Sequence, residues 1–136
     1  LPTITQLLLR LPLLKLLLLK QADGLVLAVM QVTQETGWWA AEQMGIEAEN
    51  LDLTEPDTNI RIGCWYLSWL TEKFDGVTET ALAGYNAGHG NVSKWLADEA
   101  MSADGITLEE IPFEETKSYV KKVQLAQLAY KYVYRQ

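Results

Sequence analysis

The chain has 136 residues, which is enough for one domain with a hydrophobic core. Hydrophobic residues make up 49% of it, with five Trp and six Tyr, and this composition excludes a disordered chain. The formal net charge of −7 argues against a nucleic-acid partner, because such binding needs basic groups that neutralise phosphates. The single Cys64 excludes an intrachain disulfide and is expected to be a small buried side chain.

Residues 1–29 form an atypical Leu-rich segment. From Leu7 to Leu19 every residue is leucine except Arg10, Pro12 and Lys15. These interruptions disfavour a membrane-spanning helix, which needs about 20 mostly apolar residues. A signal peptide would begin with basic residues and end at a small-residue cleavage site, and neither is clear here. We expect a core-packing helix and give the segment no functional role.

The first regular helix is predicted from Thr33 to Met44, because Thr33 is a suitable N-cap and Gly45 supplies a C-terminal stop. The acidic stretch 46–55 is expected to be irregular. A long helix then begins at Pro56-Asp57 and ends at Gly76. Its spacing places four apolar side chains on one face, Ile60, Cys64, Leu67 and Phe74.

Three further helices are predicted, from about Val77 to Asn86, from about Asn91 to Glu99, and from Glu114 onward, with a loop over Met101 to Glu110. The last helix is expected to bury one face, made of Tyr119, Val123, Ala126, Tyr130 and Val133. No segment shows the alternation of a strand over several residues. The fold class is therefore expected to be all-α, with a single domain over 1–136.

A glycine-rich helix end is the most distinctive feature of the sequence. Gly84, Gly88 and Gly90 bracket Tyr85 and Asn86. Glycine allows a sharp turn and a close approach of the backbone to a ligand. Free backbone groups are also available at a helix end. A phenol and an amide presented in this way predict a polar recognition site that suits a polysaccharide.

The stretch that contains these residues resembles the Ala-Tyr-Asn-Ala-Gly signature of the soluble lytic transglycosylases, relatives of goose-type lysozyme that cleave bacterial peptidoglycan. Gly84 stands at its first position. Four segments resemble family motifs and follow the family's order. Residues 30–37 resemble the second half of Gly-Leu-Met-Gln and the helix start after it, and 57–67 resemble the helix before the signature. Residues 81–92 contain the signature, and 111–120 resemble the segment that closes the site. The resemblance covers about Met30 to Tyr130.

The resemblance implies a lysozyme-like transglycosylase domain with a sugar cleft between helices. It implies that Tyr85 and Tyr119 support the catalytic acid, and that Thr116 helps to build the closing wall. It implies substrate binding by six residues, Met30, Gln31, Tyr85, Asn86, Ala87 and Glu115. The implied partner is peptidoglycan glycan strands, without a metal or an organic cofactor, and the implied location is the bacterial periplasm or cell envelope.

The sequence departs from the family at the catalytic acid, which is the glutamate of a Glu-Ser pair before the Met-Gln motif. The chain contains no Glu-Ser pair, and no acidic residue lies between Asp23 and Glu35. In one interpretation, 21–29 begins the catalytic helix and roughly twenty residues are missing before Met30, as judged from the motif spacing. In the other, the register is continuous and leucine near Leu13 or Leu14 occupies the position of the acid. We favour the first.

The family's chemistry uses one acid. It protonates the glycosidic oxygen between N-acetylmuramic acid and N-acetylglucosamine, and the C6 hydroxyl of the muramic acid closes on C1 to give a 1,6-anhydro product. Two other classes of function stay open. In the first, the chain is a member of the same fold that binds glycan strands or a secretion partner without cutting. In the second, it is a structural or designed helical protein on this scaffold.

Several polar and aromatic residues have simpler explanations than catalysis. Glu35 is expected to favour the N-terminal dipole of its helix. His89 is expected to face solvent from a loop. Five tryptophans are candidates for stacking on sugars but at helical spacing are more often core, Trp38, Trp39, Trp65, Trp69 and Trp95.

Overall fold

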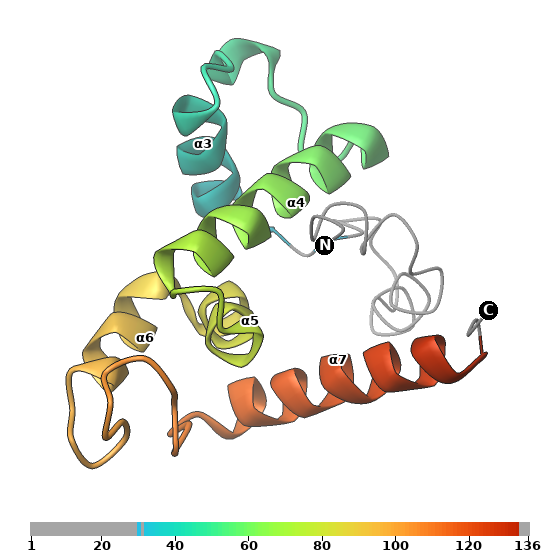
Figure 1. The fold of residues 1–136 in the computed structure, drawn as a ribbon. Coiled ribbons are helices and arrows are strands. Elements are labelled where there is room, and N and C mark those ends of the chain that lie inside the picture. Colours follow the sequence, from blue (N-terminus) through green and yellow to red (C-terminus); the bar gives the residue numbers. More distant parts are fainter. Residues whose placement is uncertain (1–29, 31, 134–136) are drawn as a thin grey trace. The chain divides into compact units, whose positions relative to one another are not determined.

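The computed structural model describes Met30 and residues 32–133. The predicted Leu-rich helix and Gln31 lie outside these residues. Every regular element in the described part is a helix, which confirms the all-α class. The helices, labelled as in Figure 1, are α3 (Gln34–Gln43), the 3₁₀ turn η1 (Ala48–Asn50), α4 (Pro56–Lys73), α5 (Thr78–Ala87), α6 (His89–Leu96) and α7 (Glu114–Val133).

The chain divides into two compact units, with the division between Tyr66 and Leu67, inside α4. The first unit contains α3. This helix begins at Thr33, whose hydroxyl accepts a hydrogen bond from the Thr36 amide, and it ends before Gly45, whose φ is +74°. Both predicted boundaries are confirmed. A Cβ at Gly37 would lie 2.5 Å from Leu53 Cδ1, so this glycine lets the segment before α4 pack directly on α3.

Asn59, in the first half of α4, organises the interior of this unit. Its side chain is 1% exposed. The Oδ1 atom accepts from the Met30 amide at 2.9 Å, and Nδ2 donates to the Leu53 carbonyl at 3.1 Å. One buried amide thus ties two chain segments to the helix, which satisfies backbone groups that burial would otherwise penalise.

The stretch 46–55, which was predicted to be irregular, contains one regular element, because η1 adds a single 3₁₀ turn to it.

The second unit packs α5 against α6 and α7. Its buried hydrophobic side chains come from the second half of α4 and the residue after it, from the three following helices and from the loop before α7. They are Leu67, Leu70, Phe74, Ala81, Leu82, Ala83, Val92, Trp95, Leu108, Ile111, Val120 and Ala126. Cys64, Leu67 and Phe74 are buried as predicted, whereas Ile60 is only half-buried. On α7, Tyr119 and Val123 are half-buried and Ala126 is buried, while Val120 adds a buried position that the predicted face lacked.

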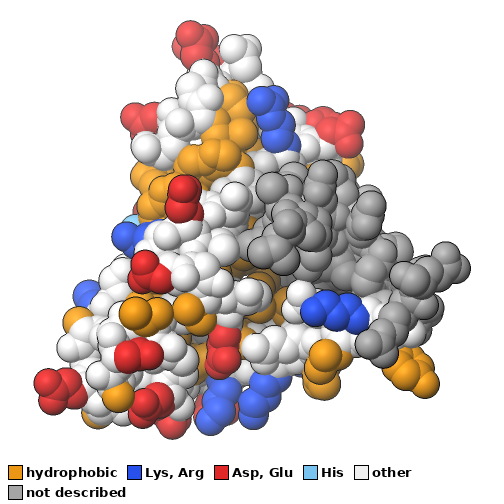
Figure 2. Space-filling view, in the orientation of Figure 1, with side chains coloured by type: hydrophobic (Ala, Val, Ile, Leu, Met, Phe, Trp, Pro, Cys, Tyr) orange, Lys and Arg blue, Asp and Glu red, His pale blue; other side chains and the backbone are white. Residues whose placement is uncertain are grey.

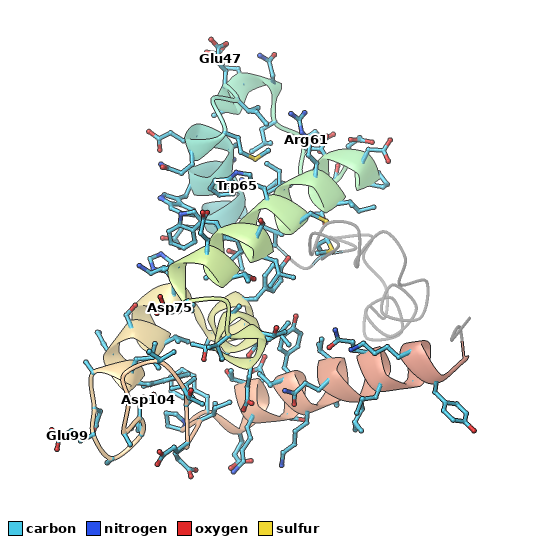
Figure 3. The ribbon with its side chains drawn as sticks, in the orientation of Figure 1. Glu47, Arg61, Trp65, Asp75, Glu99 and Asp104 are labelled. Carbon is cyan, nitrogen blue, oxygen red and sulfur yellow. The ribbon has the colours of Figure 1, made fainter. Side chains whose placement is uncertain are left out.

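The loop from Ala97 to Phe113 is anchored at both ends and in its middle. Trp95 and Phe113 pack edge to face, with ring centroids 5.0 Å apart. The Thr80 hydroxyl on α5 donates to the Ile106 carbonyl at 3.2 Å. Asp104, labelled in Figure 3, accepts from the Ile106 and Thr107 amides, and these bonds lower the pKa of its carboxyl to about 2. A long connection is therefore held in place before α7 begins.

The helix boundaries differ from the prediction mainly around Gly88. The predicted loop before Asn91 is absent, because α6 begins at His89 and ends at Leu96. One residue, Gly88, is both the C-cap of α5 and the N-cap of α6, at φ 90° and ψ 141°. L-amino acids avoid this region because of their Cβ, so the direct junction depends on glycine.

We predict that Gly88→Ala lowers the free energy of unfolding by about 1–3 kcal/mol, the usual strain of a side chain in this backbone region. No atom lies within 4 Å of a Cβ built at Gly88, so a steric clash would not contribute. Gly90→Ala is the matched control, since Gly90 lies inside α6 and is not among the positive-φ glycines. Urea unfolding of both variants checks this, and equal stabilities of the two would contradict it.

Candidate functional site

The glycine-rich signature occupies the end of α5 and the junction with α6. The Gly88 amide donates to the Gly84 carbonyl at 2.9 Å, and Asn91 Nδ2 donates to the Ala87 carbonyl at 2.8 Å. These bonds satisfy two of the carbonyls that a helix end leaves open. Tyr85, Asn86 and Ala87 are half-buried here. The last turn of α5 is therefore rigid and still partly accessible, as a recognition site requires.

Close packing explains why glycine stands at the first signature position. A Cβ at Gly84 would lie 3.0 Å from Phe74 Cε2 and 3.1 Å from Leu70 Cδ2. Leu70 lies in α4 and Phe74 directly follows its last residue, and both side chains are buried. An alanine would need these neighbours to move by a few tenths of an ångström. In this chain, Leu70 and Phe74 fill the space that a methyl group would take, and the departure from the signature is a packing difference.

Asn86 is joined to α7 by a direct side-chain contact. The Thr116 hydroxyl donates a hydrogen bond to Asn86 Oδ1 at 2.7 Å. Thr116 is 1% exposed, whereas Asn86 is half-buried. Two segments 30 residues apart thus meet at the predicted site. Because the Thr116 hydroxyl is shielded from water, this short hydrogen bond fixes the orientation of the two side chains more strongly than a solvent-exposed one would.

The first turns of α7 carry two more predicted residues. Glu115 is exposed and Tyr119, one turn later, is half-buried. Burial raises the pKa of the Tyr119 phenol to about 12, and the protonated hydroxyl is a group that can donate a hydrogen bond. In the same region Lys117 Nζ lies 3.8 Å from Glu110 Oε1, a surface ion pair. Surface pairs of this kind contribute little to stability.

His89 is not the solvent-facing loop residue that was expected. It begins α6 and is half-buried, and its ring meets Trp69 edge to face with centroids 5.1 Å apart. Lys73 Nζ lies 5.3 Å from the centroid of the same indole, within cation–π range. Desolvation, and to a smaller extent the charge of Lys73, lower the pKa of His89. The histidine is therefore an aromatic neighbour of the signature, and its surroundings favour the neutral imidazole.

Met30 and Gln31 belong to the first unit of the chain. Met30 is 8% exposed, and its amide is bound to Asn59. Gln31 lies outside the described residues, so its part in the site stays a prediction. Two further residues bind the backbone next to predicted site residues, Asn59 at the Met30 amide and Asn91 at the Ala87 carbonyl. Neither was predicted from the sequence. Asparagine near a helix start is compatible with many roles, so only the fold identifies what these side chains hold.

The tryptophans divide between core and surface. Trp95 is buried, and Trp39, Trp65 and Trp69 are half-buried, whereas Trp38 is 51% exposed. Within the first unit, Trp39 packs on Trp65 with centroids 5.9 Å apart. Trp65, labelled in Figure 3, points from α4 toward the side on which α3 lies. Packing thus accounts for most of these rings.

The described residues contain no group of three or more His, Cys, Asp or Glu side chains that could hold a metal ion. None of the helices in that part of the chain is long and apolar enough to cross a membrane. Figure 2 shows Asp and Glu side chains gathered over the end of the second unit that carries α6 and the loop after it. This surface matches the negative charge of the whole sequence and does not favour an anionic partner.

The sequence matches the family described as Transglycosylase SLT domain over residues 22–106, more than half of the chain. The matched range contains the signature at the end of α5 and the helix α4 that supports it. Taken with the all-helical fold, this match shows that the chain belongs to the SLT transglycosylase family.

Curated relatives carry the corresponding names. The chain is 45% identical over 84 residues to the soluble lytic murein transglycosylase of Salmonella typhimurium, and 43% identical over 84 residues to that of Escherichia coli. Each alignment covers 61% of this chain and 12% of the relative. A putative soluble lytic murein transglycosylase of Haemophilus influenzae is 32% identical over 121 residues, which cover 85% of this chain and 19% of that protein. The chain thus spans a small part of these relatives. No solved structure matches.

We predict that the single histidine titrates below its ordinary pKa of 6.5, because burial disfavours its charged form. The unfolded chain then binds a proton at higher pH than the folded chain does. The free energy of unfolding should therefore fall as the pH drops below about 6.5. NMR titration of the imidazole protons measures the pKa, without ambiguity since no other histidine is present.

Two variants separate the causes of this shift. Lys73→Gln should raise the pKa of His89 part of the way toward 6.5, since desolvation is the larger cause and stays in place. His89→Gln should remove this part of the pH dependence of stability. A histidine pKa at or above 6.5 in the folded wild type would contradict the packing of the imidazole against Trp69.

Proposed function

We propose that the protein cleaves the glycan strands of bacterial peptidoglycan as a lytic transglycosylase. The observation that carries this proposal is the signature turn Tyr85-Asn86-Ala87, held at the end of α5 and bonded to α7 through Thr116. Family membership and the names of the curated relatives support it. The chain covers only a small part of those relatives. The activity named for them is therefore proposed for this protein.

The described residues supply the groups that sugar recognition needs. Asn86 offers an amide, and Tyr119 offers a phenol that stays protonated. Glu115 offers an exposed carboxylate at the start of α7. Hydroxyl and N-acetyl groups of a glycan can pair with donors and acceptors of these kinds. We assign Tyr85 and Tyr119 to the support of the catalytic acid, and Asn86, Ala87 and Glu115 to the substrate, together with Met30 and Gln31.

In this proposal, the catalytic acid belongs to a segment of roughly twenty residues between Val29 and Met30, as judged from the motif spacing. The family match begins at residue 22, so residues 22–29 fall in the same matched range as the signature. The glutamate would protonate the glycosidic oxygen between N-acetylmuramic acid and N-acetylglucosamine. It would then accept the proton of the C6 hydroxyl as that oxygen bonds to C1, so that one acid suffices and no water is consumed.

A second candidate is a family member that binds glycan strands without cleaving them. The observation that favours it is the absence of any Glu-Ser pair from the 136 residues. Both candidates use the same recognition groups on α5 and α7, and both place the protein in the bacterial periplasm or cell envelope. They differ only in whether an acid reaches the glycosidic oxygen.

The first test is the intact mass of the purified protein, with a peptide map across Val29 and Met30. We expect a mass heavier than the 136 residues allow and a junction peptide that contains Glu-Ser. A mass equal to that of the 136 residues would reject the inserted segment, and the non-cleaving candidate would then hold.

The second test is digestion of purified peptidoglycan sacculi, with the products identified by mass spectrometry. We expect 1,6-anhydro-muropeptides from the wild type. Tyr85→Phe and Asn86→Ala should each lower kcat/KM by about fivefold, since a lost hydrogen bond of about 1 kcal/mol changes a rate by that factor. Ser93→Ala, at an exposed position of α6, is the control and should leave the rate unchanged. Hydrolysed products without the anhydro bond, or no products at all, would contradict the transglycosylase proposal.

A further inference from the structure

The hydrogen bond between Thr116 and Asn86 fixes the direction of the Asn86 amide as well as its position. We infer that Thr116 is a positioning residue that fixes the direction of the Asn86 amide, so that Asn86 presents an N–H donor and the site selects the carbonyl oxygen of an acetamido sugar. This inference rests on the proposed function, because it concerns how the same site recognises glycan.

The two ends of an asparagine amide have opposite hydrogen-bonding character, since Oδ1 accepts and Nδ2 donates. Oδ1 of Asn86 is occupied by the Thr116 hydroxyl at 2.7 Å. Among the described residues, no atom accepts a hydrogen bond from Nδ2, and no buried side-chain nitrogen or oxygen lacks a partner. Because Asn86 is half-buried, its Nδ2 is the end that stays open to a ligand.

The burial of Thr116 decides between the two directions of the amide. If the amide were rotated by 180°, Nδ2 would donate to the threonine oxygen, and the hydroxyl proton would lose Asn86 Oδ1 as its acceptor. The side chain is 1% exposed, so water is not available to replace that acceptor. An unsatisfied buried donor is costly, and the direction with a donating hydroxyl is favoured.

A fixed donor defines the chemistry of the group it meets. Both sugars of peptidoglycan carry an acetamido group, whose carbonyl oxygen is a strong acceptor without a competing donor at the same atom. A sugar hydroxyl can also accept, but it can rotate and pair equally well with an acceptor on the protein. The fixed amide therefore favours sugars with an N-acetyl group over sugars with only hydroxyls.

The test uses the full protein with two readouts, the Kd for tetra-N-acetylchitotetraose by calorimetry, and KM and kcat on sacculi. Thr116→Val keeps the shape and removes the hydroxyl, which frees the amide to turn. We expect it to weaken the binding of the tetrasaccharide and raise KM by about fivefold to twentyfold, with kcat changed less than twofold, as for loss of one oriented hydrogen bond. Thr116→Ser keeps the hydroxyl and should restore both values.

A matched control comes from α5 itself. Thr80 is also fully buried, and its hydroxyl donates to the Ile106 carbonyl at 3.2 Å, away from the signature turn. Thr80→Val should lower thermal stability to an extent similar to Thr116→Val but leave Kd and KM unchanged. A merely structural role of Thr116 predicts instead that the two valine variants behave alike.

Asn86→Asp probes the donor directly. The carboxylate still accepts from Thr116 but has no N–H for the ligand, so the Kd should weaken at least as much as in Thr116→Val. The double variant should be no weaker than Asn86→Asp alone, because both changes act on the same hydrogen bond.

Three results would overturn the inference, namely an unchanged KM in Thr116→Val, no recovery in Thr116→Ser, or wild-type binding in Asn86→Asp. If the wild type binds the tetrasaccharide and releases anhydro-muropeptides while the variants behave like it, only the inference fails. If the wild type neither binds nor cleaves, the proposed function fails, and the inference fails with it.

Discussion

The signature site depends on a single backbone constraint, the conformation of Gly88 at φ 90° and ψ 141°. Because one residue ends α5 and begins α6, no loop separates the two helices, and the last turn of α5 cannot fray without displacing α6. Gly84, which has no Cβ, then lets this turn pack closely against the side chains of Leu70 and Phe74. Thr116 holds it from α7. The polar groups of the signature are therefore positioned by the backbone first and by hydrogen bonds second.

Much of this part of the fold could be predicted from local sequence signals. Thr33 and Gly45 mark the ends of α3 because capping is a property of a few neighbouring residues. The start of α7 at Glu114 was also predicted, and so was the burial of Cys64, because free cysteine is among the most buried residue types. The signature residues themselves were found as a motif, since three glycines around a phenol and an amide form an unusual local pattern.

What the sequence did not reveal are contacts between distant segments. Nothing near Thr116 indicates that its hydroxyl meets a side chain 30 residues earlier, and nothing near Asn59 indicates that it holds the Met30 amide. His89 was misplaced for the same reason, because its burial comes from Trp69 on another helix. The exact role of a polar residue depends on which partner the tertiary fold brings to it, and local propensity carries no information about that partner.

The groups proposed to recognise the glycan are thus positioned independently of the catalytic acid. Asn86, Thr116 and Tyr119 lie on α5 and α7, within one compact unit. An acid placed beside them adds proton transfer to a site whose donors are already oriented. Pre-orientation of this kind lowers the entropy lost when the glycan binds, and binding energy can then be used on the reacting bond. The proposal accordingly implies that a chain with this unit and no acid would bind N-acetylated glycan and lose only the cleavage step.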